Sequence, residues 1–169
     1  MTNMLRLARI VLDPGPTARW SPTIALLAGL ALLAARLWLG WAFLRTGVHR
    51  VATWDSQSFL FSMVHPVPFL PAEIAAPVTT AAELALPSLL ILGLLARPAA
   101  FGLAVMAATI YFVVGQTPEG IENGIALASE QFPWMAVGLA IAAFGAGPLS
   151  LDALLRRYVD ERPPLASRK

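Results

Sequence analysis

Two ionisable residues stand in the middle of long apolar segments, where a charge is costly. Arg36 lies within an apolar run that begins at Thr23, and Glu83 lies within a second run that begins at Ala72. A charged side chain in hydrocarbon costs at least ~2.5–3.5 kcal/mol, so ionisable groups at this depth usually find a partner and serve a function. Consecutive spans usually lie side by side. We therefore predict that Arg36 and Glu83 pair with each other and that the pair serves a function. The alternative is that the ion pair only holds the helices together.

The segment that carries Arg36 also has a face of small residues. At about 100° per residue, Gly29, Gly40 and Gly47 fall within about 40° of Arg36 on a helix. Small residues mark the places where helices approach closely inside a membrane. We therefore expect Arg36 to face neighbouring helices and not lipid.

The segment that carries Glu83 contains a repeated motif, Ala-Glu-X-Ala-X-Pro, which ends at Pro77 and again at Pro87. Each proline lacks the N–H group that would bond the carbonyl four residues earlier, and those carbonyls belong to Glu73 and Glu83. A broken helix near the centre of a membrane often marks a binding site. A plain kink is the alternative, because neighbouring groups can satisfy the freed carbonyls.

Several other side chains could contribute to a polar pocket. Thr79 and Thr80 stand one turn before Glu83 and could form hydrogen bonds with it. Tyr111, in the third apolar segment, could contact a quinone, although packing is the simpler interpretation. The remaining pocket candidates lie at the ends of apolar segments: Glu73, Arg97 and Glu130.

The sequence offers little for metal or thiol chemistry. His49 and His65 are the two histidines, and with Met63 and nearby glutamates they could bind copper. Their spacing matches no fixed ligand pattern, so surface histidines without a ligand role are the simpler interpretation. The chain has no cysteine. This excludes a disulfide, a dithiol redox centre, a thiolate metal site and a cysteine nucleophile, and we expect no covalently bound cofactor.

Composition sets the class of protein. The chain has 169 residues, of which 57% are hydrophobic and 13% are charged, whereas soluble domains are ~45–50% apolar and ~25% charged. Its length suits four spans of about 20 residues each. We therefore predict an all-α fold, a transmembrane four-helix bundle, with spans at about 23–48, 72–95, 99–116 and 132–147. A basic amphipathic leader (1–22) precedes the membrane domain (23–148), and an amphipathic tail (149–169) follows it.

The distribution of lysine and arginine predicts the topology. Three of these residues lie in the N-terminal tail and five in the C-terminal tail, whereas the loop at 117–131 is acidic. Positive residues stay on the cytoplasmic side, so we expect both termini, each with a short amphipathic helix, in the cytoplasm of a bacterium and the spans in its inner membrane. These basic residues are topology signals, and we expect no nucleic-acid partner.

Three motifs in order resemble the DoxX family of small four-span membrane proteins. They are Arg-Leu-Trp-Leu-Gly at 36–40 with Gly47 after it, Glu83 with Leu-Gly-Leu-Leu-Ala-Arg at 92–97, and Gly-Pro-Leu-Ser-Leu-Asp at 147–152. The resemblance implies a bundle similar to the vitamin K epoxide reductase type. In addition, it implies that Arg36, Glu83 and Arg97 are the positions that match the family's motifs. It also implies functions linked to thiosulfate–quinone oxidation or to soluble redox and sulfur-handling enzymes. The lack of cysteine departs from the dithiol chemistry of the wider fold group.

These observations favour a membrane subunit of a redox complex, in which a quinone carbonyl could accept a hydrogen bond from Arg36. Such a subunit would be non-catalytic on its own, because no electron-carrying cofactor motif is present, and it would act with a soluble redox or sulfur-handling enzyme. A small transporter or metal-handling protein, acting as a homo-oligomer or with a partner, is one alternative. A structural membrane anchor is the other.

Overall fold

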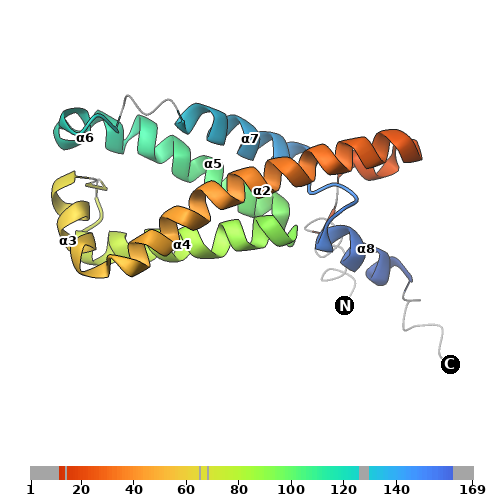
Figure 1. The fold of residues 1–169 in the computed structure, drawn as a ribbon, viewed down its shortest axis with the longest axis horizontal. Helices are drawn as coiled ribbons and strands as arrows, with labels where there is room; N and C mark the ends of the chain where they lie inside the picture. Colours follow the sequence, from red (N-terminus) through yellow and green to blue (C-terminus); the bar gives the residue numbers. More distant parts are fainter. Residues whose placement is uncertain (1–11, 14, 65, 68, 126–129, 162–169) are drawn as a thin grey trace.

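The computed structural model describes residues 12–13, 15–64, 66–67, 69–125 and 130–161. Within these residues the chain forms helices and turns and no strand (Figure 1), which confirms the all-helical prediction. Three segments are long and apolar enough to cross a membrane: α2 (Pro22–Ala52), α4 (Ala72–Leu92), and Ala96–Gln116, which comprises α5 (Ala96–Phe112) and the turn η4 (Val114–Gln116). A fourth apolar helix, α7 (Gln131–Phe144), is shorter.

Short elements connect the long helices and complete the chain. They are η1 (Pro16–Arg19), η2 (Trp54–Ser56), α3 (Gln57–Phe59), the π-helical turn η3 (Leu60–Val64), α6 (Pro118–Glu122) and α8 (Leu151–Glu161). Helix α2 continues four residues past its expected end, because none of residues 49–52 is a glycine or a proline. The hydroxyl and the N–H of Thr53 both donate to the carbonyl of His49. His49 and Arg50 are therefore helical and not part of a loop.

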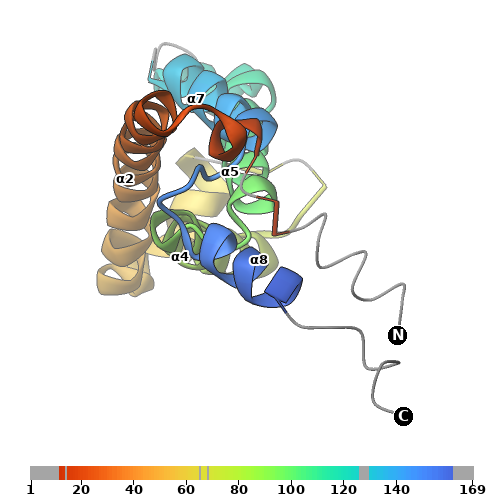
Figure 2. The ribbon, with the colours of Figure 1, turned by 90° about the vertical axis from the view of Figure 1, so that its right-hand side faces the viewer.

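The long helices pack as two antiparallel pairs, α2 with α4 and α5 with α7, and the four helices surround a common core (Figure 2). Glycines allow these close approaches. Gly138 of α7 lies against the backbone of Ala100 in α5, and Gly40 of α2 lies against Ile91 and the carbonyl of Pro87 in α4. The core between the pairs is apolar, and its largest buried members are Leu39, Phe43, Leu90, Leu103 and Ile141.

The two helices of the first pair are offset along their length. Gly47 lies against the backbone of Glu83, and further along α2, Arg36 lies against Gly93, just after the end of α4. The N-terminal part of α2 therefore runs past the turn between α4 and α5 (Figure 1), and Gly29 packs there on Pro148 and Leu149.

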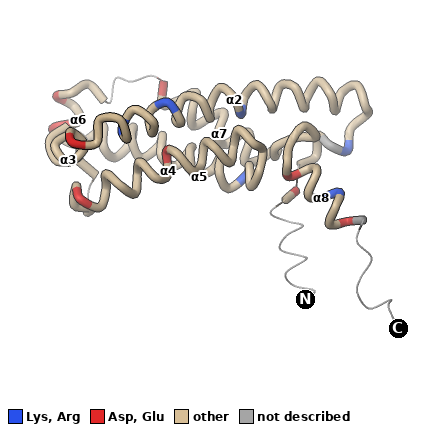
Figure 3. Tube along the Cα trace, turned by 60° about the horizontal axis from the view of Figure 1, so that its bottom comes forward, with Lys and Arg blue, Asp and Glu red and all other residues tan. Residues whose placement is uncertain are grey.

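Charged residues are concentrated at the ends of the bundle. Acidic residues gather around α3 and α6 at one end, and the tube between the ends is mostly uncharged (Figure 3). At the other end, Asp13 lies near Arg97, and Asp152 at the start of α8 accepts hydrogen bonds from the first residues of α5. The predicted leader falls mainly on residues 1–11, which lie outside the described residues.

Replacing Gly47 with alanine is expected to lower the free energy of unfolding by about 1–3 kcal/mol, the usual cost of overpacking. A Cβ there would lie 2.9 Å from the carbonyl oxygen of Glu83, so the α4 backbone would have to move. Gly102→Ala is the control, because the nearest neighbour of a Cβ there is the flexible end of Leu86, which can move aside. This variant should be at least as stable as the wild type, since alanine has a helix propensity ~0.8–1.0 kcal/mol more favourable than glycine. Unfolding in mixed micelles, followed by circular dichroism, measures both; equal stability of the two variants would contradict the close contact.

Candidate functional site

The structure contains a cavity of about 460 Å³ among α2, α4, α5 and α7, in the half of the bundle that faces α3 and α6. Phe43, Met106, Ile110 and Trp134 form part of a mostly apolar wall. Six polar side chains also line it: Thr46, Arg50, Thr79, Glu83, Thr109 and Gln131. An apolar cavity with a few convergent polar groups is the usual form of a small-molecule site.

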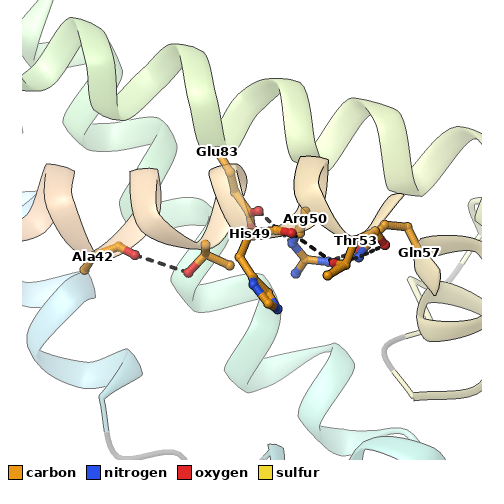
Figure 4. Close-up of polar contacts among 7 residues, drawn as sticks. Ala42, His49, Arg50, Thr53, Gln57 and Glu83 are labelled. Atoms are coloured by element: carbon orange, nitrogen blue, oxygen red, sulfur yellow. Dashed lines mark hydrogen bonds and ion pairs between the residues drawn. The ribbon is translucent and has the colours of Figure 1, made fainter. Parts of the chain in front are cut away.

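A buried ion pair forms the polar part of the cavity wall. The Nε atom of Arg50 lies 2.7 Å from Oε2 of Glu83, and the side chains are 15% and 2% exposed. The Nη1 atom of Arg50 donates to Oε1 of Gln57 at 3.2 Å, and the guanidinium lies 4.9 Å from the centre of the Phe61 ring. Gln57 in turn donates to the carbonyl and hydroxyl oxygens of Thr53 (Figure 4). Arg50 is thus held on three sides.

Local sequence explains how Glu83 reaches Arg50. Gly47 has no side chain, so the α4 backbone at Glu83 can approach α2. Pro87 is buried within α4 and cannot donate to the carbonyl of Glu83, and that carbonyl faces α2 at Gly47. The repeated motif therefore marks a real helix contact at its second copy.

Two acceptors in the cavity wall have spare capacity. Oε2 of Glu83 has its ion pair with Arg50 but no well-aligned hydrogen bond among the described residues, and Oε1 of the buried Gln131 has no hydrogen-bond partner among them. Buried polar atoms normally have partners. These oxygens could accept hydrogen bonds from a bound molecule.

The predicted pair of Arg36 with Glu83 is wrong. Both side chains are buried, at 0% and 2% exposure, but Glu83 pairs with Arg50. Glu83 is level with Gly47, and Arg36 lies eleven residues before Gly47, which is about 16 Å along a helix. The prediction aligned the midpoints of the two spans, whereas the helices are offset because α2 extends past α4.

Arg36 belongs to a second polar cluster, at the other end of the bundle. Its Nη2 donates to the carbonyl of Leu149 at 2.5 Å, and its charge acts on Asp152. The carboxylate of Asp152 accepts the N–H groups of Leu95 at 2.8 Å and Ala96 at 3.0 Å, so it caps the start of α5. Gly93 has a φ of +68°, and a Cβ there would collide with Nη1 of Arg36.

Asp152 is 1% exposed. Burial raises the pKa of Asp152, because the N–H donors of Ala96 and Leu95 and the charges of Arg36 and Arg97 only partly offset the lost hydration. We call Arg36, Gly93, Leu149 and Asp152 the Arg36–Asp152 cluster. It joins α2, the α4–α5 turn and α8, and it lies outside the cavity wall.

The other predicted pocket residues divide between the cavity and the surface. Thr79 lines the cavity, whereas Thr80 is buried beside it, and its hydroxyl has no hydrogen-bond partner among the described residues. The expected bonds from these threonines to Glu83 are therefore not formed. Tyr111 packs on Phe112 and Phe132 and lies outside the cavity wall.

Three predicted charges also lie outside the cavity wall. Glu73 and Glu130 are exposed, although Gln131, next in the chain, lines the cavity. Arg97 is at the opposite end, where it donates to the carbonyl of Ala143 at 3.3 Å and lies 3.9 Å from Asp13.

The copper candidates that the structure describes lie on the surface. His49 and Met63 are exposed, and His65 lies outside the described residues. Across the part of the chain that the structure describes, no group of three or more histidine, aspartate and glutamate side chains could hold a metal ion.

Sequence reasoning missed Arg50, Gln57, Gln131 and Asp152. Arg50 lies two residues past the expected end of the first span, at 48, and was not among the predicted site residues. A signal for it existed, because Arg50 lies within about 40° of Arg36 on the same helix face as Gly47. No comparable signal marked Gln57 or Gln131, whose roles depend on how the connecting segments fold.

Comparisons with known proteins agree with the resemblance seen in the motifs. An uncharacterized protein of Haemophilus influenzae is 29% identical over an alignment of 137 residues, and the alignment covers 77% of this chain and 86% of that protein. No solved structure matches the chain. The model of the DoxX family matches residues 31–116, which include Arg36, Arg50 and Glu83. With helices long and apolar enough to cross a bilayer, the chain is a membrane protein that belongs to the DoxX family.

Proposed function

We propose that this DoxX protein is a membrane subunit of a redox complex and that it binds the headgroup of a quinone in the cavity beside Arg50 and Glu83. One observation carries the proposal: an apolar cavity of about 460 Å³ inside a membrane protein contains a buried, constrained ion pair. Ionisable groups at such positions are expensive, and by default they serve a function.

The chemistry of the cavity suits both redox forms of a quinone. A quinone presents two carbonyl acceptors, and the guanidinium of Arg50 is a donor in the cavity wall. A quinol presents two hydroxyl donors, and Glu83 and Gln131 carry acceptor oxygens with spare capacity. The quinone supplies the transfer of two electrons and two protons, whereas the protein orients the headgroup and excludes water from it.

The same proposal includes a topology. In our proposal α7 is the fourth span, and both tails lie on the cytoplasmic side of a bacterial inner membrane. Two observations support this: the tails carry most of the arginine and lysine, and Asp13 and α8 lie at the same end of the bundle. A soluble redox or sulfur-handling partner would then meet α8 and the α4–α5 turn.

Quinone binding is the direct test. In nanodiscs, decylubiquinone is expected to raise the thermal unfolding midpoint of the wild type, because a ligand that binds only the folded state stabilises it. Glu83→Gln should lower the affinity about 10- to 100-fold, because Arg50, the donor to the quinone carbonyl, loses the ion pair that holds its guanidinium in the cavity wall, and a hydrogen bond to a charged group contributes ~1.5–3 kcal/mol. Titration of the midpoint against the quinone-to-lipid ratio measures this.

Glu73→Gln is the matched control. It makes the same change in the same helix at an exposed carboxylate outside the cavity wall, so the affinity should equal that of the wild type. Absence of binding by the wild type, or equal binding by the Glu83→Gln variant, would contradict the proposal and favour a transporter or an anchor.

A further inference from the structure

The cavity has an opening on one side of the bundle. Of the residues that line it, only Val78 and Val105 have large exposed fractions, 56% and 46%; the others are buried or half-buried. Val78 belongs to α4 and Val105 to α5. The cavity therefore opens between these two helices, and we call Val78 and Val105 the mouth of the cavity.

The surface around the mouth is apolar. On α4, the exposed Ile74 lies one turn before Val78 on the same face; on α5, the exposed Phe101 and Phe112 lie on the same face as Val105. Helix α4, and α5 together with η4, are long and apolar enough to cross a membrane. A mouth between two such faces opens toward the hydrocarbon of the bilayer and not toward water.

The arrangement of α4 and α5 explains why the mouth forms at this level. The helices share the turn at Gly93–Leu95, which the Arg36–Asp152 cluster holds closed. From that turn they run apart toward α3 and α6 (Figure 1), and the cavity lies in the part where they diverge.

We propose that the ligand of this cavity is a membrane-dissolved amphiphile that enters sideways from the bilayer, with its headgroup beside Arg50 and Glu83 and its apolar tail between Val78 and Val105. This rests on the proposed function for the identity of the headgroup, a quinone. The volume of about 460 Å³ is near the lower end of small-molecule sites, ~300–1,000 Å³. It holds a headgroup, whereas a long tail must leave through the mouth.

Two probes with the same headgroup separate the mouth from the headgroup site: decylubiquinone, and 2,3-dimethoxy-5-methyl-1,4-benzoquinone, which has no tail. In the full chain in nanodiscs, Val105→Trp should weaken binding of decylubiquinone at least 10-fold and change binding of the tail-less probe less than 2-fold. Phe101→Trp, one turn away on the same lipid-facing side and outside the cavity wall, should change neither. Equal weakening of both probes by Val105→Trp, or no weakening of either, would overturn the sideways entry.

A second measurement tests the mouth without any ligand. Because the chain has no cysteine, Val105→Cys can carry a single nitroxide label. Relaxation of that label by oxygen, which concentrates in lipid, should exceed relaxation by a water-soluble nickel complex. A label relaxed mainly by nickel would overturn the lipid-facing mouth. Failure of both quinones to bind the wild type, with a lipid-exposed label at 105, would instead refute the quinone and leave the mouth in place.

Discussion

Replacing Arg50 with methionine is expected to lower the free energy of unfolding by about 3–5 kcal/mol, because it leaves a buried carboxylate without its cation. Glu83 is 2% exposed, and its ion pair is with Arg50. The substitution would also remove the contacts of the guanidinium with Gln57 and the Phe61 ring. Unfolding in mixed micelles, followed by circular dichroism, measures the loss, and decylubiquinone binding should be lost as well.

The double variant Arg50→Met with Glu83→Gln identifies the source of that loss. With both charges gone, most of the stability should return, since replacing a whole buried pair by neutral groups is often neutral or stabilising. The coupling between the two positions is read from the double-mutant cycle. Arg45→Met, at an exposed arginine of the same helix, should be close to wild type. A coupling energy near zero would show that the pair does not stabilise the fold.

The same double variant separates structure from function. If the pair served only to hold α2 and α4 together, a stable protein without either charge would keep all its other properties. If the pair binds a headgroup, that stable protein should fail to bind decylubiquinone. The structural interpretation and the ligand interpretation of this pair therefore predict opposite results in one sample.

The helices and the buried charges could be predicted from the sequence, because both follow from local patterns. Apolar runs are long enough to identify α2, α4 and α5, and the glycine face that includes Gly47 correctly placed Arg36 inside the bundle. The cost of a charge in hydrocarbon also identified Glu83 as a residue that needs a partner.

The partners could not be predicted, because they depend on the offset between helices. Aligning the centres of two spans put Arg36 opposite Glu83, but Gly47 is the α2 residue at that level. A shift of eleven residues along α2 changes which arginine Glu83 meets. The part of α2 that passes the α4–α5 turn packs at Gly29 on Pro148 and Leu149, which are far away in the sequence.

The cavity itself also depends on long-range packing. Its wall combines four helices with Phe61, Val67 and Ile125 from the connecting segments, and no local pattern shows that these come together. Glu130 was predicted as a pocket residue, whereas its neighbour Gln131 lines the cavity. One residue is a rotation of about 100° on a helix, which is enough to move a side chain from the site to the surface.

Replacing Asp152 with alanine is expected to lower the free energy of unfolding by about 3–5 kcal/mol, although the residue lies in a surface helix. The change would leave the N–H groups of Leu95 and Ala96 without an acceptor and the fully buried Arg36 without the nearby negative charge. Asp152→Asn should cost less, because its amide oxygen still accepts one of the two N–H groups. Mixed-micelle unfolding measures both variants.

Asp160→Asn on the same helix is the matched control. It breaks an exposed pair with Arg156, and such i,i+4 pairs contribute only about 0.3–0.5 kcal/mol. If Asp152→Ala were no more costly than Asp160→Asn, the Arg36–Asp152 cluster would not hold α8 to the bundle. A loss of several kcal/mol confined to Asp152 would show that one carboxylate joins α2, α5 and α8.

The two buried arginine–carboxylate clusters should then differ in what their loss affects. Asp152 is at the end of the bundle opposite to the cavity, so Asp152→Asn, studied where it is still folded, should bind decylubiquinone with the affinity of the wild type. Glu83→Gln should instead lower the affinity for decylubiquinone. Because both changes neutralise one buried carboxylate, a general loss of stability cannot explain opposite results. If Asp152→Asn also weakened binding, a change at the α4–α5 turn would have altered the shape of the cavity, since α4 and α5 diverge from that turn to form the mouth.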